Sequence, residues 1–215
     1  CSRDWSSDVC SSDLLCKDFP ISPSENITNC SYDDANKQNF IENSSKILNF
    51  DKIDNQCQKV TGKSNRNRSP DCLVYRESND TLYFVEFKSG GCKYKDVRYK
   101  IIDGFTNIFH YALKKNIVKS KEEFMAINFR FCLIRRNARE VAIRDSILGA
   151  LELGEETRGT EAFKDLEDIY LNKVSIIMTP EKVPDVFFSL TDGRITEINY
   201  HYLDKAVRTI VTSKI

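Results

Sequence analysis

The stretch that decides the fold is SPDCLVYRESNDTLYFVEFK, residues 69–88. Its two halves are rich in β-branched and aromatic residues, and the polar segment Ser78-Asn-Asp80 separates them. Two such runs joined by turn-forming residues predict a β-hairpin. Because side chains alternate along a strand, Glu86 and Lys88 must point to the same face of this hairpin.

The register of the hairpin decides whether a third polar residue joins them. If Asn79 and Asp80 form a two-residue turn, Asp71 lies opposite Lys88, and Asp71, Glu86 and Lys88 share one face. Two acids and a lysine at the end of an apolar hairpin are costly to bury without a partner. A divalent cation resolves this conflict, since Mg²⁺ is held by one or two carboxylates together with water and phosphate oxygens. A lysine beside it can orient or help deprotonate an attacking water and counter the charge that builds on a phosphate.

A structural interpretation of the same residues stays open. Glu86 and Lys88 are then a surface pair on one strand, and Asp71 only caps the strand that follows Pro70. The strand-turn-strand context, with a helix expected on either side of it, favours the catalytic interpretation.

Helices are predicted before and after the hairpin. Apolar residues at helical spacing predict a helix over residues 33–50, whose start Asp33 or Asp34 can cap. A second apolar stripe predicts a long amphipathic helix over residues 95–115. Residues 137–172 are predicted to be mostly helical.

Further apolar segments have the composition of strands. They are residues 128–134, 173–178, 186–190 and 195–200. Helices that alternate with strands predict an α/β fold with a mixed central β-sheet flanked by helices. We expect residues 15–215 to form one domain.

The N-terminal segment is set apart from this domain. Residues 3–14 resemble the translation of a common short-read sequencing adapter. We therefore expect residues 1–14 to be an artefact joined to a truncated gene, with true coding sequence beginning near Leu15. The segment has neither the basic nor the apolar region of a signal peptide, and its residues are excluded from any site.

Composition limits the classes of function. Lys and Arg number 32 and Asp and Glu number 32, so the formal net charge is zero, which argues against a general polyanion-coating protein. No apolar run approaches the roughly 20 residues needed to cross a bilayer, so no membrane span is expected. None of the eight cysteines forms a Cys-x-x-Cys pair. Reduced cysteines and a cytoplasmic location are the simplest expectation.

At Pro70-Asp71 and Glu86-Phe87-Lys88 the sequence resembles the PD-(D/E)XK nuclease superfamily. The resemblance covers residues 33–115. It implies a restriction-endonuclease-like fold with the site on the central hairpin. It also implies that Asp71 and Glu86 are metal ligands, that Lys88 is the catalytic lysine, and that the cofactor is Mg²⁺, with Mn²⁺ as the alternative ion.

Many members of this superfamily add a glutamate from the helix before the hairpin. Glu42 is the best-placed match for that third metal ligand, and Asp51 or Asp54 is the alternative.

The resulting hypothesis is a metal-dependent nuclease that cuts DNA, with RNA as the less favoured substrate. Lys95, Arg98 and Lys100 open the helix after the hairpin and are candidates for contacts with backbone phosphates, although a solvated helix turn explains them equally well. The alternative hypothesis is a catalytically inactive nuclease-fold module that binds nucleic acid or a protein partner.

Overall fold

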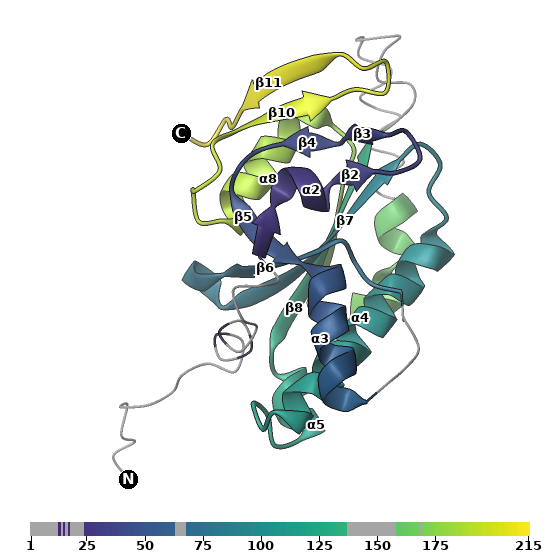
Figure 1. The fold of residues 1–215 in the computed structure, drawn as a ribbon, viewed down its shortest axis with the longest axis vertical. Helices are drawn as coiled ribbons and strands as arrows, with labels where there is room; N and C mark the ends of the chain where they lie inside the picture. The colour runs from purple at the N-terminus through teal and green to yellow at the C-terminus, as the bar shows by residue number, and fades with distance from the viewer. Residues whose placement is uncertain are drawn as a thin grey trace.

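The described part of the chain folds around three β-sheets, of which the largest has six strands (Figure 1). This computed structural model describes residues 13, 15, 17, 24–62, 68–136, 158–167 and 169–215. The strands are β1 (Ser24–Asn26), β2 (Tyr32–Asp33), β3 (Gln38–Asn39), β4 (Ile41–Glu42), β5 (Lys46–Asn49), β6 (Cys72–Arg76), β7 (Thr81–Ser89), β8 (Asn128–Arg136), β9 (Lys173–Ile177), β10 (Glu197–His201) and β11 (Val207–Val211). The α-helices are α2 (Ile27–Cys30), α3 (Phe50–Thr61), α4 (Tyr94–Lys114), α5 (Lys121–Met125), α7 (Lys164–Glu167) and α8 (Val183–Leu190), and short 3₁₀ turns cover Glu77–Asn79 and Pro180–Lys182.

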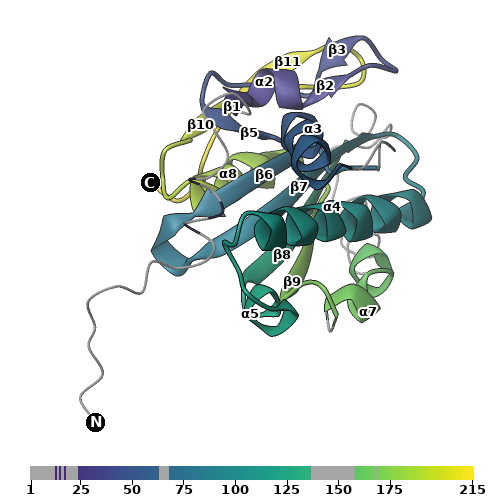
Figure 2. The same ribbon diagram turned by 60° about the horizontal axis from the view of Figure 1, so that its bottom comes forward.

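The large sheet is mixed, as predicted. Its strand order is β1-β5-β6-β7-β8-β9; the first four strands pair antiparallel, whereas β7, β8 and β9 pair parallel. Parallel neighbours need a crossover connection, and α4 with α5 supplies the one between β7 and β8. That crossover carries α4 back across the sheet beside β7 (Figure 2).

The two faces of the large sheet are buried in two separate cores. On β7, Leu82 and Phe84 pack with α3, α4 and α5, whereas Tyr83 and Val85 face the opposite core with α8 and β10. A strand buried on both faces has few exposed positions, and β7 is buried from Thr81 to Phe87. Glu86 lies inside that buried run.

The predicted hairpin is confirmed as β6 and β7, but its expected register is wrong. Cys72 pairs with Val85 and Arg76 with Thr81, so the turn spans residues 77–80 instead of 79–80 alone. The register therefore shifts by two residues and brings Asp71 next to Glu86 instead of Lys88. Because the side-chain period of a strand is two, this shift leaves every side chain on its expected face.

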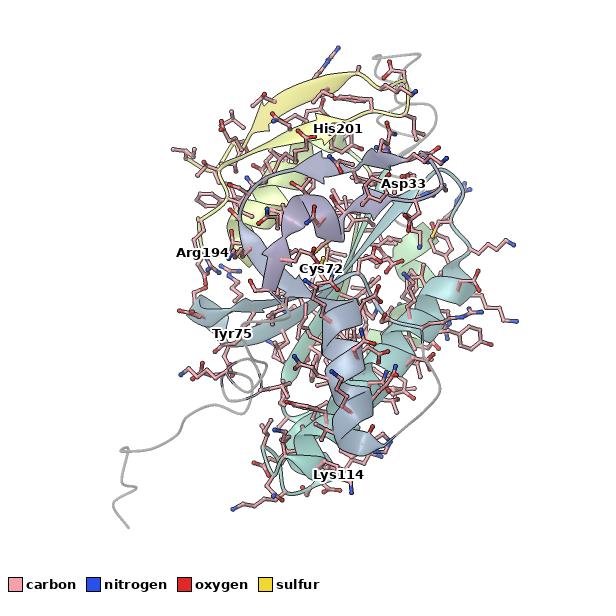
Figure 3. All side chains as sticks on the ribbon, viewed as in Figure 1. Asp33, Cys72, Tyr75, Lys114, Arg194 and His201 are labelled. Atoms are coloured by element: carbon pink, nitrogen blue, oxygen red, sulfur yellow. The ribbon has the colours of Figure 1, made fainter. Side chains whose placement is uncertain are left out.

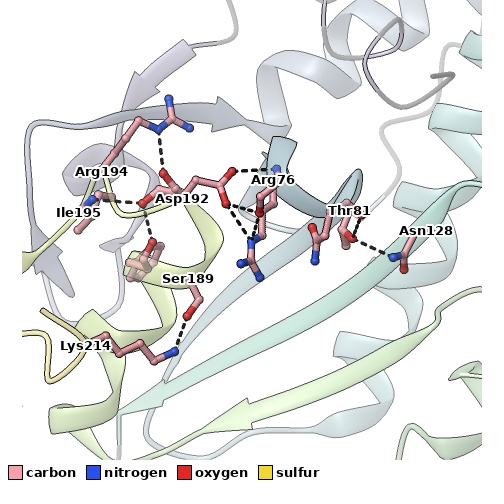
Figure 4. A network of polar contacts seen from close by, with 12 residues as sticks. Arg76, Thr81, Asn128, Ser189, Asp192, Arg194, Ile195 and Lys214 are labelled. Carbon is pink, nitrogen blue, oxygen red and sulfur yellow. Dashed lines mark hydrogen bonds and ion pairs between the residues drawn. The ribbon is translucent and has the colours of Figure 1, made fainter. Parts of the chain in front are cut away.

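A polar network holds the hairpin turn against the C-terminal half of the chain (Figure 4). Asp192, in the turn after α8, accepts hydrogen bonds from Arg76 Nε at 3.0 Å and from the backbone N–H of Ser78 at 3.2 Å. The guanidinium and the backbone donor are thus satisfied by one carboxylate. The register of β6 and β7 is fixed at the end of the hairpin away from Asp71.

The predicted helix over residues 33–50 is wrong. That stretch forms β2 to β5, and the helix begins only at Phe50. Ile47 and Leu48 are neighbours that pack on opposite faces of a strand, with Ile47 in one core and Leu48 against the other, and this imitates a helical pair. Asp33 does accept backbone hydrogen bonds, from Ala35 and Asn36, but they close a turn between β2 and β3.

The predicted strand over residues 186–190 is also wrong, because that segment belongs to α8. Pro184 lies in the first turn of α8, where proline is favoured, and Val183, Phe187 and Leu190 recur at helical spacing on its buried side.

The other expected elements are confirmed with small changes in their bounds: the helix over 95–115 as α4 and the strands at 128–134, 173–178 and 195–200 as β8, β9 and β10. Residues 137–157 of the predicted helical region, and residues 1–12, lie outside the described residues. Leu15 is fully buried in the core beneath α3 and α4. None of the helices that the structure describes has both the length and the apolar character needed to cross a membrane.

A buried arginine joins the C-terminal end of β8 to both smaller sheets. Arg136 is fully buried, and its guanidinium donates to Asp33 Oδ2 at 2.8 Å, to Ser89 Oγ at 2.8 Å and to the carbonyl oxygen of His201 at 2.6 Å. It also lies over the ring of Phe40 at 4.6 Å. Figure 3 labels Asp33 of β2 and His201 of β10, the two residues that Arg136 joins.

Candidate metal site on the central hairpin

Backbone hydrogen bonds fix Asp71 just before β6. Its N–H donates to the carbonyl oxygen of Val85 at 3.1 Å, and its own carbonyl oxygen accepts from the N–H of Phe50 at 3.0 Å. The side chain is held as well, since Oδ2 accepts from the N–H of Phe87 at 2.7 Å. Oδ1 of Asp71 faces Lys100 of α4. Cys72, the next residue along, marks the place of the site near the middle of the molecule (Figure 3).

Glu86 supplies the second carboxylate from the buried centre of β7. Its side chain is 0% exposed and lies on the face of the sheet that α4 covers. Oε1 lies 2.6 Å from Lys88 Nζ and 2.7 Å from Lys100 Nζ. Among the described residues, no group forms a hydrogen bond with Oε2, although that atom is buried.

Lys100 reaches the site from α4 and connects the two acids. Its Nζ lies 2.7 Å from Glu86 Oε1 and 3.2 Å from Asp71 Oδ1. The ammonium therefore occupies the space between the two carboxylates, on the side where α4 crosses β7. Asp71, Glu86, Lys88 and Lys100 thus form one cluster of two negative and two positive charges.

Close packing of α4 against the start of the hairpin permits this reach. A Cβ atom at Gly104, one turn after Lys100, would lie 2.8 Å from Pro70 Cδ and 3.3 Å from Phe50 Cζ. Any larger residue at position 104 would push against the rigid proline ring. Gly104 therefore lets α4 approach the residue that directly precedes Asp71.

The charges of the cluster shift the pKa values of its buried members. Burial raises the pKa of Glu86 to about 7, and the negative charge of Asp71 adds to the rise, while Lys100 and Lys88 oppose it. Burial lowers the pKa of Lys100, but the charges of Asp71 and Glu86 and their hydrogen bonds outweigh it and raise that pKa above its ordinary value. Lys100 therefore stays charged, and Glu86 is the group whose charge changes near neutral pH.

The structure brings the three predicted site residues together, with Lys100 as a fourth that sequence reasoning placed elsewhere. Lys100, a candidate for a phosphate contact or for a solvated helix turn, lies inside the cluster. A sequence signal for this existed: Lys100 falls on the same side of α4 as Val97, Ile101 and Gly104, which are all buried. A lysine on the buried stripe of a helix needs an acidic partner.

The expected position of Glu42 is wrong. Glu42 lies on β4 of the three-stranded sheet, and its Oε1 is 2.9 Å from Asn39 Nδ2 and 3.1 Å from His201 Nε2. It cannot come from a helix before the hairpin, because its segment pairs with β10. No contact joins it to Asp71 or Glu86 in the described part of the chain.

The two alternative third acids both lie on α3. Asp51 accepts from Ser69 Oγ at 2.9 Å. Asp54 is buried, and its two oxygens accept from Asn107 of α4 and from Gln58. The bonds to Ser69 and Asn107 thus tie α3 to the segment before β6 and to α4.

Arg98 and Lys95, the other two residues predicted to contact phosphates, have different surroundings in the structure. Arg98 donates to Asp165 and, at 2.8 Å, to the carbonyl oxygen of Ala162, so its guanidinium joins α4 to the segment before β9. Lys95 is exposed, and its Nζ lies 5.9 Å from the centre of the Tyr99 ring. Arg98 and Lys100 are therefore paired with carboxylates, whereas Lys95 is the exposed one of the three.

The donor set fits a small divalent ion. Asp71 Oδ1 and Glu86 Oε1 already share one cation, the Lys100 ammonium, and Glu86 Oε2 is an additional buried oxygen without a donor. Across the described ranges, no group of three or more His, Cys, Asp or Glu side chains is arranged to hold a metal. An ion at this point would take two carboxylates and complete its coordination with water and phosphate oxygens, as Mg²⁺ commonly does.

The cysteines that the structure describes are mostly buried. Cys30, Cys57, Cys72 and Cys132 are buried, and Cys92 is partly exposed. Burial raises the pKa of Cys132 to about 12, so this thiol stays protonated and behaves as a small hydrophobic side chain.

Comparison with known proteins adds no relative: no family model, no curated protein and no solved structure matches the chain. The chemistry of the site therefore has to follow from its own residues.

Proposed function

We propose that this chain is a Mg²⁺-dependent nuclease whose hairpin carboxylates, Asp71 and Glu86, hold the ion while Lys88 assists the reaction. The observation that carries the proposal is the shared ammonium: Lys100 Nζ lies within 3.2 Å of an oxygen of both acids. Both acids already direct an oxygen at one cation, and a divalent ion held by two carboxylates would take that cation's place. DNA is the first substrate to test and RNA the second.

The residues of the site would have different roles in this reaction. A bound Mg²⁺ would supply the positive charge that polarises a phosphodiester and activates water. Asp71 and Glu86 hold that charge in place, since both are fixed by the hairpin. Lys88 lies at the end of β7 with its side chain 31% exposed, so its ammonium can reach a phosphate that approaches from solvent.

The reaction that these residues support is hydrolysis. The oxygen of a water molecule forms a new bond to phosphorus, and the bond from phosphorus to the leaving sugar oxygen breaks. One proton leaves the attacking water, and one proton reaches the leaving oxygen. Lys88 stabilises the negative charge that develops on the phosphate during this exchange.

Cleavage of supercoiled plasmid and of end-labelled single-stranded DNA and RNA tests the proposal. We expect the wild type to cut in Mg²⁺ and not in chelator, and Asp71→Asn and Lys88→Met to lose at least about 100-fold in rate. Lys52→Met is the matched control, because Lys52 pairs with Glu25 outside the site at 3.2 Å. Equal cutting by the wild type and both site variants would assign the activity to a contaminant and contradict the proposal.

A second candidate function is a non-catalytic module of the same fold. The observation in its favour is that Lys88 and Lys100 already balance the charges of Asp71 and Glu86. Such a module would bind nucleic acid or a protein without a metal. It predicts no cleavage under any ion and equal DNA affinity for the wild type and Asp71→Asn in chelator.

A further inference from the structure

We propose that Lys100 is a built-in counter-ion of the site, which a divalent ion must displace in order to bind Asp71 and Glu86. This inference rests on the proposed function, since it describes how the same two carboxylates take up their metal. It assigns Lys100 a positioning role in the metal-free protein and makes the affinity for metal depend on that lysine.

The position of Nζ is the first reason. It lies 3.2 Å from Asp71 Oδ1 and 2.7 Å from Glu86 Oε1, between the oxygens that an ion would bridge. Mg²⁺ binds oxygens at about 2.1 Å and tolerates little distortion of its geometry. The ammonium and the metal ion cannot share that space, and their positive charges repel each other at such separations.

The second reason is the difference between the two lysines. Lys88 is recorded in contact with Glu86 Oε1 alone, whereas Lys100 contacts both acids. Glu86 Oε2 is buried without a hydrogen-bond donor among the described residues. An ion between Asp71 Oδ1 and Glu86 Oε1 would therefore take the place of the Lys100 ammonium. Lys88 contacts Glu86 and not Asp71, so it can stay beside that carboxylate.

The charge balance of the site indicates where the displaced Lys100 side chain can go. With Glu86 ionised, two carboxylates and two ammonium groups sum to zero, so an added divalent ion leaves a surplus of two positive charges in a partly buried site. Phosphate oxygens can neutralise that surplus. The Lys100 side chain is 23% exposed and can turn towards such an anion. Bound metal should therefore raise the protein's affinity for phosphate, and bound phosphate should raise its affinity for metal, because such coupling is reciprocal.

Titration of the folded protein with Mn²⁺, with free ion counted by electron paramagnetic resonance, tests the role of Lys100. We expect Lys100→Met to bind Mn²⁺ about 5- to 150-fold more tightly than the wild type, the usual range of such coupling. Lys88→Met is the matched control, and its gain should be several-fold smaller. Inorganic phosphate should tighten Mn²⁺ binding to the wild type more than to Lys100→Met.

The outcomes separate this inference from the proposed function. If the wild type binds Mn²⁺ at Asp71 and Lys100→Met binds it no more tightly, Lys100 does not compete and the inference is overturned, while the nuclease proposal stands. If neither protein binds Mn²⁺, both are overturned.

Should Lys100→Met fail to fold, nitrogen-15 spectra of the lysine side chains in the wild type give the answer. We expect the Lys100 ammonium signal to be protected in chelator and to lose that protection when Mg²⁺ is added. A signal that stays unchanged while Mg²⁺ binds would equally contradict the inference.

Discussion

The carboxylate of Glu86 and the ammonium of Lys100 lie 2.7 Å apart although 14 positions separate them in the chain. They meet because β7 and β8 are parallel neighbours, so the connection between them must cross back over the sheet. α4 is the first part of that crossover, and Lys100 lies two turns from its start, above the buried centre of β7. A single contact thus links the topology of the sheet to the chemistry of the site.

The first prediction concerns pH and the stability of the metal-free protein. The pKa of Glu86 is raised from 4.5 to about 7 in the folded chain, so the folded state binds a proton more tightly than the unfolded state does. This group's contribution is fully present below about pH 4.5 and is lost as the pH rises through about 7. Urea unfolding in chelator should show stability falling between about pH 5 and pH 8 in the wild type.

Glu86→Gln removes that titration, so the stability of this variant should change less with pH than that of the wild type over the same pH range. Glu25→Gln, which alters a carboxylate outside the site, should keep the wild-type slope. A slope that is the same in the wild type and Glu86→Gln would show that another group titrates there.

The second prediction concerns the packing of α4. Gly104→Ala places a methyl group 2.8 Å from Pro70 Cδ, where the ring cannot move aside. The overlap should cost about 1–3 kcal/mol, and the better helix propensity of alanine should return up to about 1 kcal/mol. We expect a net loss of about 1 kcal/mol in the free energy of unfolding, measured by chemical denaturation.

Gly91→Ala provides the control, because no atom lies within 4 Å of the added Cβ there. Stability equal to or above that of the wild type in Gly104→Ala would mean that α4 does not press on Pro70.

The third prediction concerns the arginine at the end of β8. Arg136→Met leaves Asp33 without its cationic partner and deprives the His201 carbonyl of a donor. Breaking one side of a buried ion pair should cost about 3–5 kcal/mol in the free energy of unfolding. Asp33→Asn should cost less, and the double variant less than the sum of both. Arg208 lies on the exposed strand β11, so Arg208→Met should keep a free energy of unfolding close to that of the wild type. If Arg136→Met loses no more stability than Arg208→Met, Arg136 does not have this role.

The fourth prediction concerns nucleic acid on the surface beside the site. Lys95 is the exposed member of the predicted basic set, so Lys95→Ala should weaken DNA binding and reduce its salt slope by about one. Fluorescence anisotropy in chelator measures both without cleavage. Lys173→Ala, at the opposite end of the parallel strands, should leave the slope unchanged. The same slope for all three proteins would place the DNA elsewhere.

The sequence predicted those parts of the site that depend on local periodicity. Glu86 and Lys88 share a face because strands alternate, and Asp71 joins them because a register shift of two residues preserves that face. Lys100 was placed on the correct helix, but its contact with Glu86 depends on a crossover that brings distant residues together. No local pattern specifies such a contact.

The failures of sequence reasoning have a common physical cause. The apolar pair Ile47-Leu48 fits a helix and a short strand equally well, because β5 faces both cores, whereas Phe40 and Ile41 lie in the same core. The mistaken helix put Glu42 beside the hairpin, whereas β4 carries it into the three-stranded sheet. In α8 the run Val186-Phe187-Phe188 has strand-like composition, yet Pro184 and the spacing of the buried residues favour a helix.

Crystals soaked in MnCl₂ and measured for anomalous scattering test the central claim most directly. We expect one anomalous peak within coordination distance of Asp71 Oδ1 and a Glu86 oxygen, with Lys100 Nζ moved away from both acids. Loss of the peak in Asp71→Asn crystals would complete the assignment. An absent peak at high Mn²⁺ concentration, with Lys100 still between the two carboxylates, would contradict a metal-dependent nuclease.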